Sequence, residues 1–194
     1  MKPCRKTATK LGGEVEVDET FIGVKARNMH RRKREKVING RGLEGKEIAF
    51  GIVQRGGNVI VAHVGTRQKK DLQPLIKDRV KAGTAIFSDE LQSYDGLSTD
   101  YQHTVINHAV EYVRGNVHTN TMENFWSLVK RQLHGTYISV EPFHLFRYLD
   151  EQAFRYNTRH GNDYARFEHV CRQIVGRRLT WNRLTGKDEQ PATV

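Results

Sequence analysis

Hydrophobic and polar positions alternate over the segment from Glu14 to Phe21, and this period of two predicts a β-strand. The apolar members of the alternation suit a core, which leaves Asp18 on the opposite face or at the end of the strand. Two further runs rich in β-branched residues are joined by Arg55-Gly56-Gly57-Asn58, a connection typical of a β-hairpin. The strands of this hairpin are expected at 48–54 and 59–64.

Apolar residues then recur every three to four positions from 72 to 80, which predicts a helix with Asp71 as its N-cap. This N-cap would place Pro74 in the first turn, where the missing N–H of proline is tolerated. The apolar run 85–87 shows no alternation, as expected of a strand that is buried on both faces. That strand is expected to end at Ser88-Asp89.

The second half of the chain is predicted to be mainly helical. The expected elements are a short strand at 104–106, a polar loop to His118, and helices at about 121–133, 140–157 and 164–175. Phe125 and Trp126 lie on the apolar stripe of the first of these helices, so we interpret them as core residues. The tail from Gly176 is polar and basic and is expected to be loose. The order of elements predicts a mixed-sheet α/β domain.

Composition narrows the class of protein. The chain has 194 residues, which fits one domain, and 37% of them are hydrophobic, enough for a real core. No apolar run approaches the roughly 20 residues needed to cross a bilayer, and the first ten residues lack the apolar region of a secretory signal. The two cysteines have no CxxC partner, so we expect neither a cysteine zinc site nor a disulfide scaffold, and we expect a cytoplasmic protein.

The net charge of +10 points to a polyanionic partner, most often nucleic acid. Seven of these ten excess charges come from residues 25–46, which hold nine Lys and Arg and two acids. The densest part is Arg31-Arg32-Lys33-Arg34. We interpret this segment as a basic loop between strands that contacts phosphates, although a solvated surface loop would have the same composition.

Three acids stand out by their expected positions. Asp18 lies on or at the end of the first strand, Asp89 follows the buried strand, and Glu123 lies in the first turn of an amphipathic helix. Lys130 is seven residues after Glu123, close to two helical turns, and so shares its side of the helix. Metal-assisted phosphoryl transfer uses such carboxylates, because they can hold two Mg²⁺ ions about 4 Å apart.

Each acid also has a structural interpretation. Asp18 could belong to a solvated strand face together with its neighbours Glu14, Glu16 and Glu19. Asp89 could be a turn or N-cap residue, and Glu123 could complete a capping box with Asn120. Spacing alone therefore does not make the three acids a site.

Four motifs resemble a known family. They are EVEVDETFIG at 14–23, SDE at 88–90 with Tyr94, HTNTMENFWSLVKR at 118–131 and FRYN at 154–157. Together these motifs resemble an ISXO-type insertion-sequence transposase, a member of the DDE superfamily, from about Gly12 to Arg159. The resemblance implies an RNase H-like domain, that is, a mixed β-sheet flanked by helices.

The resemblance also implies roles for individual residues. Asp18, Asp89 and Glu123 would be the catalytic acids that hold two Mg²⁺ or Mn²⁺ ions, and the reaction would be DNA strand cleavage and strand transfer of an insertion sequence. Lys130 and Arg131 would contact DNA, unless Lys130 pairs with an acid on its own helix. Further candidates for contact with DNA or substrate are Arg31, Arg32, Lys33, Arg34, His118, Asn120 and Tyr156, although His118 could be satisfied by backbone and Tyr156 could serve packing.

The expected organisation is a short, unpacked basic leader at 1–12, the catalytic domain at 13–160, and a C-terminal helix with a basic tail at 161–194. The resemblance implies a zinc-ribbon and helix-turn-helix region before the first motif, so we expect a truncated copy, an isolated catalytic domain or a fragment. The partners implied are transposon ends and target DNA, with a homodimer or higher assembly on DNA, no membrane, and a place on the nucleoid. An inactive remnant that keeps only non-specific DNA binding is the main alternative, and a stand-alone RNase H-like nuclease is the third.

Overall fold

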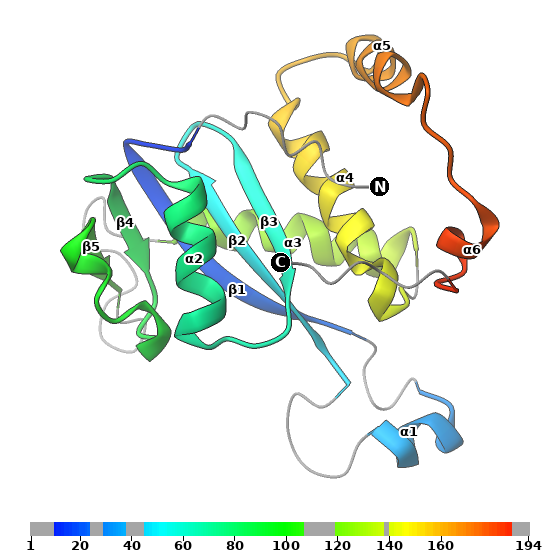
Figure 1. Cartoon of the computed structure of the whole chain (residues 1–194), viewed down its shortest axis with the longest axis horizontal. Helices are drawn as coiled ribbons and strands as arrows, with labels where there is room; N and C mark the ends of the chain where they lie inside the picture. Colours follow the sequence, from blue (N-terminus) through cyan, green and yellow to red (C-terminus); the bar gives the residue numbers. More distant parts are fainter. Residues whose placement is uncertain (1–9, 24–28, 38–44, 107–118, 138–139, 188–194) are drawn as a thin grey trace.

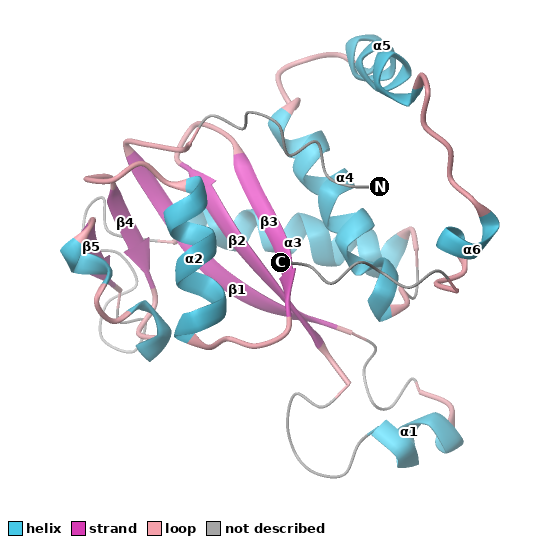
Figure 2. Cartoon of the chain, viewed as in Figure 1, coloured by secondary structure: helices cyan, strands magenta, loops and turns pink. Residues whose placement is uncertain are grey.

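The computed structural model describes residues 10–23, 29–37, 45–106, 119–137 and 140–187. Its centre is a five-stranded sheet in the order β3-β2-β1-β4-β5 (Figures 1 and 2). The strands are β1 (Glu14–Ile22), β2 (Glu47–Gln54), β3 (Val59–Val64), β4 (Ala85–Ser88) and β5 (Gln102–Val105). The first three strands are antiparallel neighbours, whereas β4 and β5 run parallel to β1. The predicted mixed sheet and the predicted hairpin are therefore confirmed.

Helices cover both faces of this sheet. They are α1 (Arg31–Val37), α2 (Lys69–Arg79), α3 (Asn120–Gly135), α4 (Leu145–Asn157), α5 (Asp163–Ile174) and α6 (Trp181–Leu184). Figure 1 shows α2 on one face of the sheet, α3 behind the other face, and α5 and α6 at the periphery. The protein is thus an α/β domain in which helices flank a mixed sheet, as the order of elements predicted.

The sheet separates two apolar cores. Alternate residues of β1 point to opposite faces, so Val15 and Val17 join α2 in the first core. The second core packs Met122, Phe125 and Trp126 of α3 against β2, β3 and α4. The interpretation of the α3 aromatics as core residues is confirmed, because their side chains are buried.

The close approach of α3 to the sheet depends on a glycine in β2. A Cβ atom at Gly51 would lie 2.1 Å from Met122 Cε and 2.8 Å from Trp126 Cζ2. A side chain at this position would force the Met122 and Trp126 side chains to shift. Gly51 pairs with Asp18 of β1, so α3 packs closely on the sheet next to this acid.

Helix α2 begins earlier than the sequence predicted. Its N-cap is Gln68, not Asp71, and Pro74 is therefore the sixth residue of the helix and not part of the first turn. The side chain of Thr66 donates a hydrogen bond to Asp71, which draws the preceding loop into the helix start. Pro74 is exposed, so the carbonyl group that it leaves without a helical partner faces solvent.

Five other local expectations are corrected. Part of the basic segment forms α1 and is no loop, with an i, i+4 ion pair of 2.8 Å between Arg31 and Glu35. Leu11 is buried against Val80, so the described end of the expected leader is packed. Helix α4 begins at Leu145 after a 3₁₀ turn, and the expected loose tail contains α6. The short strand expected at 104–106 is found at Gln102–Val105.

Helix α4 also closes the free edge of the sheet. The side chain of Asn157 accepts a hydrogen bond from the Val59 backbone N–H (2.7 Å) and donates one to the Val59 carbonyl (2.9 Å). The FRYN motif thus satisfies an edge-strand residue that would otherwise be open to pairing.

In the described part of the chain, no helix combines the length and the apolar character needed to cross a bilayer.

Candidate active site

The site lies where β1 continues past the end of β4. Strand β4 pairs with only the first three residues of β1, and Phe87 is the last partner, opposite Glu16. The chain leaves the strand after Ser88, so Asp89 comes out beside the continuing part of β1 that carries Asp18. The carboxyl ends of the adjacent parallel strands β4 and β5 meet here, and α/β proteins commonly bind ligands at such an edge.

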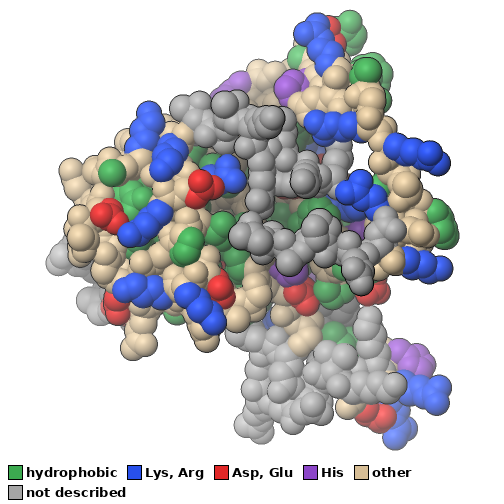
Figure 3. Space-filling view, in the orientation of Figure 1, with side chains coloured by type: hydrophobic (Ala, Val, Ile, Leu, Met, Phe, Trp, Pro, Cys, Tyr) green, Lys and Arg blue, Asp and Glu red, His purple; other side chains and the backbone are tan. Residues whose placement is uncertain are grey.

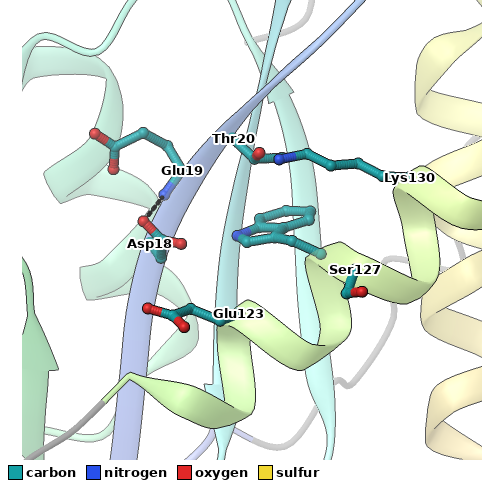
Figure 4. A pocket seen from close by; sticks show the side chains of 7 residues that line it. Asp18, Glu19, Thr20, Glu123, Ser127 and Lys130 are labelled. Carbon is teal, nitrogen blue, oxygen red and sulfur yellow. Dashed lines mark hydrogen bonds between the residues drawn. The ribbon is translucent and has the colours of Figure 1, made fainter. Parts of the chain in front are cut away.

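Helix α3 completes the site from the sheet face that carries Asp18. A pocket of about 460 Å³ separates α3 from β1. Its lining residues are Asp18, Glu19, Thr20, Glu123, Trp126, Ser127 and Lys130. Figure 4 shows the carboxylate of Glu123 directed from α3 toward Asp18, while Lys130 extends toward Thr20 at the other end of the pocket. The structure therefore brings Asp18, Glu123 and Lys130 into one pocket.

The acids of this pocket interact electrostatically. Burial, together with the charges of Glu19 and Asp89, raises the pKa of Asp18 to about 7. A hydrogen bond of 2.8 Å from the Glu19 backbone N–H opposes this shift. Burial also raises the pKa of Glu19, with Asp89 adding to the effect. Asp89 therefore acts on both Asp18 and Glu19, although it does not line the pocket itself.

Two neighbours hold Glu19 in place on the other side of β1. The Tyr94 hydroxyl donates a 2.6 Å hydrogen bond to Glu19 Oε2, and Arg67 lies 3.7 Å from Glu19 Oε1. Both partners lower the pKa of Glu19, against the effect of burial. Burial and the nearby acids raise the pKa of Tyr94 well above its ordinary value, so Tyr94 acts here as a neutral donor.

The indole of Trp126 faces Asp18. Its side chain is 3% exposed, and Nε1 is buried without a hydrogen-bond partner among the described residues. The N–H group is nevertheless close enough to Asp18 to lower the pKa of that carboxyl. A buried donor without a partner beside a carboxylate pocket is an unsatisfied group that a bound anionic oxygen can satisfy.

The structural interpretations of the three acids fare differently. A solvated strand face is wrong for Glu16 and Glu19, whose side chains are 0% and 4% exposed. The capping box is also wrong, because the N-cap of α3 is Thr119 and Glu123 lines the pocket. The turn role of Asp89 is confirmed: its Oδ1 accepts a 3.2 Å hydrogen bond from the Leu91 N–H.

Within the described ranges, no group of three or more His, Cys, Asp and Glu side chains has the spacing of a metal site. Asp18 and Glu123 share the pocket, whereas Asp89 does not line it and acts on Asp18 through its charge. Carboxylates without a counter-ion repel one another, which favours such a separated arrangement. The donors themselves are hard oxygen ligands of the kind that Mg²⁺ and Mn²⁺ prefer.

Among the other predicted site residues that the structure describes, only Lys130 lines the pocket. Arg131 is exposed on α3, and Arg31, Arg32 and Arg34 are exposed on α1. No ion pair joins Lys130 to an acid of the described chain, contrary to the alternative of a partner on its own helix. Lys33 belongs to α1, but its side chain lies outside the description, and His118 lies outside the described residues.

Asn120 is the exposed first residue of α3, and Tyr156 packs edge-on against Phe125 with ring centroids 5.3 Å apart. Arg159 covers the Tyr156 ring at 4.3 Å, so packing accounts for this tyrosine. Sequence reasoning missed Glu19, Thr20, Trp126 and Ser127 as pocket residues. The alternation of β1 could not find Glu19, because it places this residue on the face opposite to Asp18.

The fold and the site define an RNase H-like α/β domain with acids on the first strand, after the fourth strand and on a later helix. Residues 10–157 match the family described as "ISXO2-like transposase domain". The chain belongs to this family. The resemblance read from the four motifs is therefore confirmed.

Two curated relatives are similar to the chain. One, from Halobacterium salinarum, is named "Uncharacterized protein in transposable element ISH50" and is 33% identical over 63% of this chain and 45% of the relative. The other, from Haemophilus influenzae, is named "Uncharacterized transposase-like protein" and is 31% identical over 51% of this chain and 78% of the relative. The chain thus spans less than half of the halobacterial relative.

A solved structure is similar at a lower level. It is the cryo-EM structure of the simian T-cell lymphotropic virus intasome in complex with the PP2A regulatory subunit B56 gamma. The identity is 12% and the TM-score 0.43, over 75% of this chain and 48% of that chain. This likeness is too weak to add to the description of the fold.

Proposed function

We propose that this domain performs metal-dependent cleavage and strand transfer of DNA at the ends of an insertion sequence. The observation that carries the proposal is the partly buried Asp18, whose pKa is raised to about 7 in a pocket that it shares with Glu123 and under the charge of Asp89. Such a concentration of carboxylates is unfavourable unless a cation offsets it. Membership of a transposase family supports DNA as the substrate.

Asp18, Asp89 and Glu123 would hold the metal. Two Mg²⁺ or Mn²⁺ ions bound there would supply activation of the attacking oxygen and charge stabilisation of the leaving oxygen. The chain itself fixes two of these ligands on rigid elements, Asp18 on β1 and Glu123 on α3. The Asp89 side chain has one oxygen engaged by the Leu91 N–H, which orients the carboxylate and leaves Oδ2 as the ligand.

Two other pocket residues would handle the phosphate. Lys130 extends along the pocket beyond the acids and can neutralise a phosphate oxygen next to the reacting one (Figure 4). The unpartnered Trp126 N–H can donate a hydrogen bond to an anionic oxygen in the pocket. Neither group needs to change its protonation state for these roles.

Basic side chains outside the pocket would hold the rest of the DNA. Figure 3 shows Lys and Arg side chains on α1 and along the segment from α5 to α6. On the second segment, the exposed basic residues are Arg172, Arg177, Arg178, Arg183 and Lys187. The positive charge at the periphery would attract the DNA backbone. The acids would repel bare phosphates and so reserve the pocket for the metal-bound phosphate. An assembly of two or more copies on DNA is part of this proposal.

Strand cleavage of end-labelled insertion-sequence DNA tests the proposal. Wild-type protein is compared with Asp89→Asn and Asp18→Asn in Mg²⁺, in Mn²⁺ and in EDTA, and strand joining is tested with pre-cleaved ends. We expect cleavage and joining by the wild type only, with either metal and not in EDTA.

Three outcomes would count against it. Equal background cleavage by wild type and both variants, with salt-sensitive DNA binding retained, would favour a domain that only binds DNA. Cleavage without joining would favour a nuclease. Undiminished cleavage in EDTA would exclude a metal role for the acids.

A further inference from the structure

A second buried acid links the elements that carry the candidate catalytic acids. Glu16 is two residues before Asp18 on the same face of β1, and its side chain is 0% exposed. Its Oε2 accepts a 2.9 Å hydrogen bond from the Met122 backbone N–H, and its Oε1 accepts a 3.0 Å bond from Thr121 Oγ1. Glu16 thus holds the first turn of α3, immediately before Glu123.

An arginine from the β2–β3 hairpin completes this contact. Arg55 Nε donates a 2.7 Å hydrogen bond to Glu16 Oε1, and Nη1 lies 3.2 Å from Glu14 Oε2. The guanidinium also lies over the Phe87 ring of β4, at 4.2 Å from the centroid. The Arg55 side chain is 12% exposed, so this pairing is largely shielded from water.

These contacts form one network that reaches all three acid-bearing elements. Glu16 stands two residues from Asp18, Phe87 stands two residues from Asp89, and Met122 precedes Glu123. A buried ion pair adds little to stability compared with apolar packing of the same volume. The Glu16 carboxylate lies at the N-terminus of α3, where a negative charge interacts favourably with the helix dipole. Its hydrogen bonds fix the first turn of the helix relative to the sheet.

We propose that Glu16 and Arg55 are positioning residues, which set the spacing of β1, β4 and α3 so that their acids can hold metal. This inference rests on the proposed function for its consequence, but its structural part can be tested alone. Neither residue lines the pocket, so both act through the acids and not on the substrate.

The first test measures the anchoring without metal. In Glu16→Gln the side chain keeps its shape, but its amide N–H₂ group cannot accept a hydrogen bond. Either the Met122 N–H or the two donors from Arg55 and Thr121 therefore lose their acceptor. We expect hydrogen exchange of the Met122 amide to become about tenfold to a hundredfold faster. Thr121→Val, which removes only the hydroxyl donor, is a milder second variant that keeps the test open where Glu16→Gln does not fold.

Ile76→Val provides the matched control, because Ile76 is fully buried in the core on the other face of the sheet. It lowers stability without touching the network. Exchange at Met122 that is no faster in Glu16→Gln and Thr121→Val than in Ile76→Val would overturn the anchoring.

The second test measures metal affinity. The protein has two tryptophans, and Trp181 is 69% exposed on α6, so a Trp181→Phe background leaves Trp126 beside Asp18 as the single tryptophan, which can be excited selectively. Titration with Mn²⁺ should show an affinity about tenfold to a hundredfold weaker in Glu16→Gln, as for other residues that orient metal ligands. Arg55→Lys should fall in between, since lysine keeps the charge but lacks the planar fork.

The two ideas fail in different ways. Mn²⁺ binding as tight in Glu16→Gln as in Ile76→Val would overturn the positioning role and leave the proposed function intact. A wild type that neither binds Mn²⁺ nor cleaves DNA would refute the proposed function, and the exchange rate at Met122 would then decide on the anchoring alone.

Discussion

Replacing Asp18 with asparagine is expected to stabilise the metal-free protein above neutral pH. Asp18 is the acid whose pKa burial, Glu19 and Asp89 together raise from 3.8 to about 7. Asparagine keeps nearly the same shape and can still accept the hydrogen bond from the Glu19 N–H, but it carries no charge. The substitution therefore removes an unfavourable charge with little change in packing.

The sign and size of the effect follow from linkage. Between pH 3.8 and about 7 the folded protein holds a proton at Asp18 that the unfolded chain releases, so the free energy of unfolding falls as pH rises through this window. A shift of this size lowers it by about 2 to 3 kcal/mol from about pH 5 to about pH 8. Above the folded pKa of about 7 the loss is complete and no longer changes with pH.

Urea denaturation of wild type and Asp18→Asn in EDTA, at both pH values, measures this difference. The gap in unfolding free energy should grow by about 2 kcal/mol toward high pH, and Mg²⁺ should then stabilise only the wild type. Asp78→Asn, an exposed acid on α2, is the control and should change stability by less than about 0.5 kcal/mol. A gap that does not vary with pH would refute the assignment of Asp18 as a partly buried, destabilised carboxylate.

Three further predictions concern packing and DNA binding. Gly51→Ala should lower the free energy of unfolding in urea by about 1 to 3 kcal/mol, because its Cβ would meet the Met122 side chain. Gly65→Ala, with open space around it, should be nearly neutral, and equal effects of the two variants would contradict close packing of α3. Asn157→Asp should cost about 1 to 3 kcal/mol, because a carboxylate cannot donate to the carbonyl of the β3 edge, and a neutral result would refute this anchor. Lys130→Gln should weaken DNA binding and reduce the slope of log affinity against log salt by about one, and an unchanged slope would exclude a phosphate contact.

Local sequence patterns were sufficient for most of the elements. The alternation around Asp18, the Gly-Gly hairpin and the apolar stripe of α3 predicted elements that the structure contains, because period and turn chemistry are local properties. The helix starts were less well predicted. Helix α2 has Gln68 as its N-cap, and a hydrogen bond between Thr66 of the preceding loop and Asp71 supports this start. Helix propensities do not predict such a contact.

The chemistry of the candidate site was predicted in kind but not in arrangement. The resemblance selected Asp18, Asp89 and Glu123 from the many acids of the chain, and the structure places Asp18 and Glu123 in one pocket with Lys130. Glu16 and Glu19 looked like members of a solvated face. Their burial could not be read from the strand itself, because it depends on α3, the hairpin and Tyr94, which are distant in sequence.

The sequence by itself determined the α/β class, the order of the elements, the basic surplus and the identity of three candidate acids. Only the tertiary structure decided which acids share a pocket, which one is forced toward neutrality, and which one anchors a helix. The physical reason is that period, composition and motifs depend on neighbours along the chain. Desolvation, charge repulsion and hydrogen bonding of Glu16, Asp18 and Glu19 instead depend on groups that only folding brings beside them.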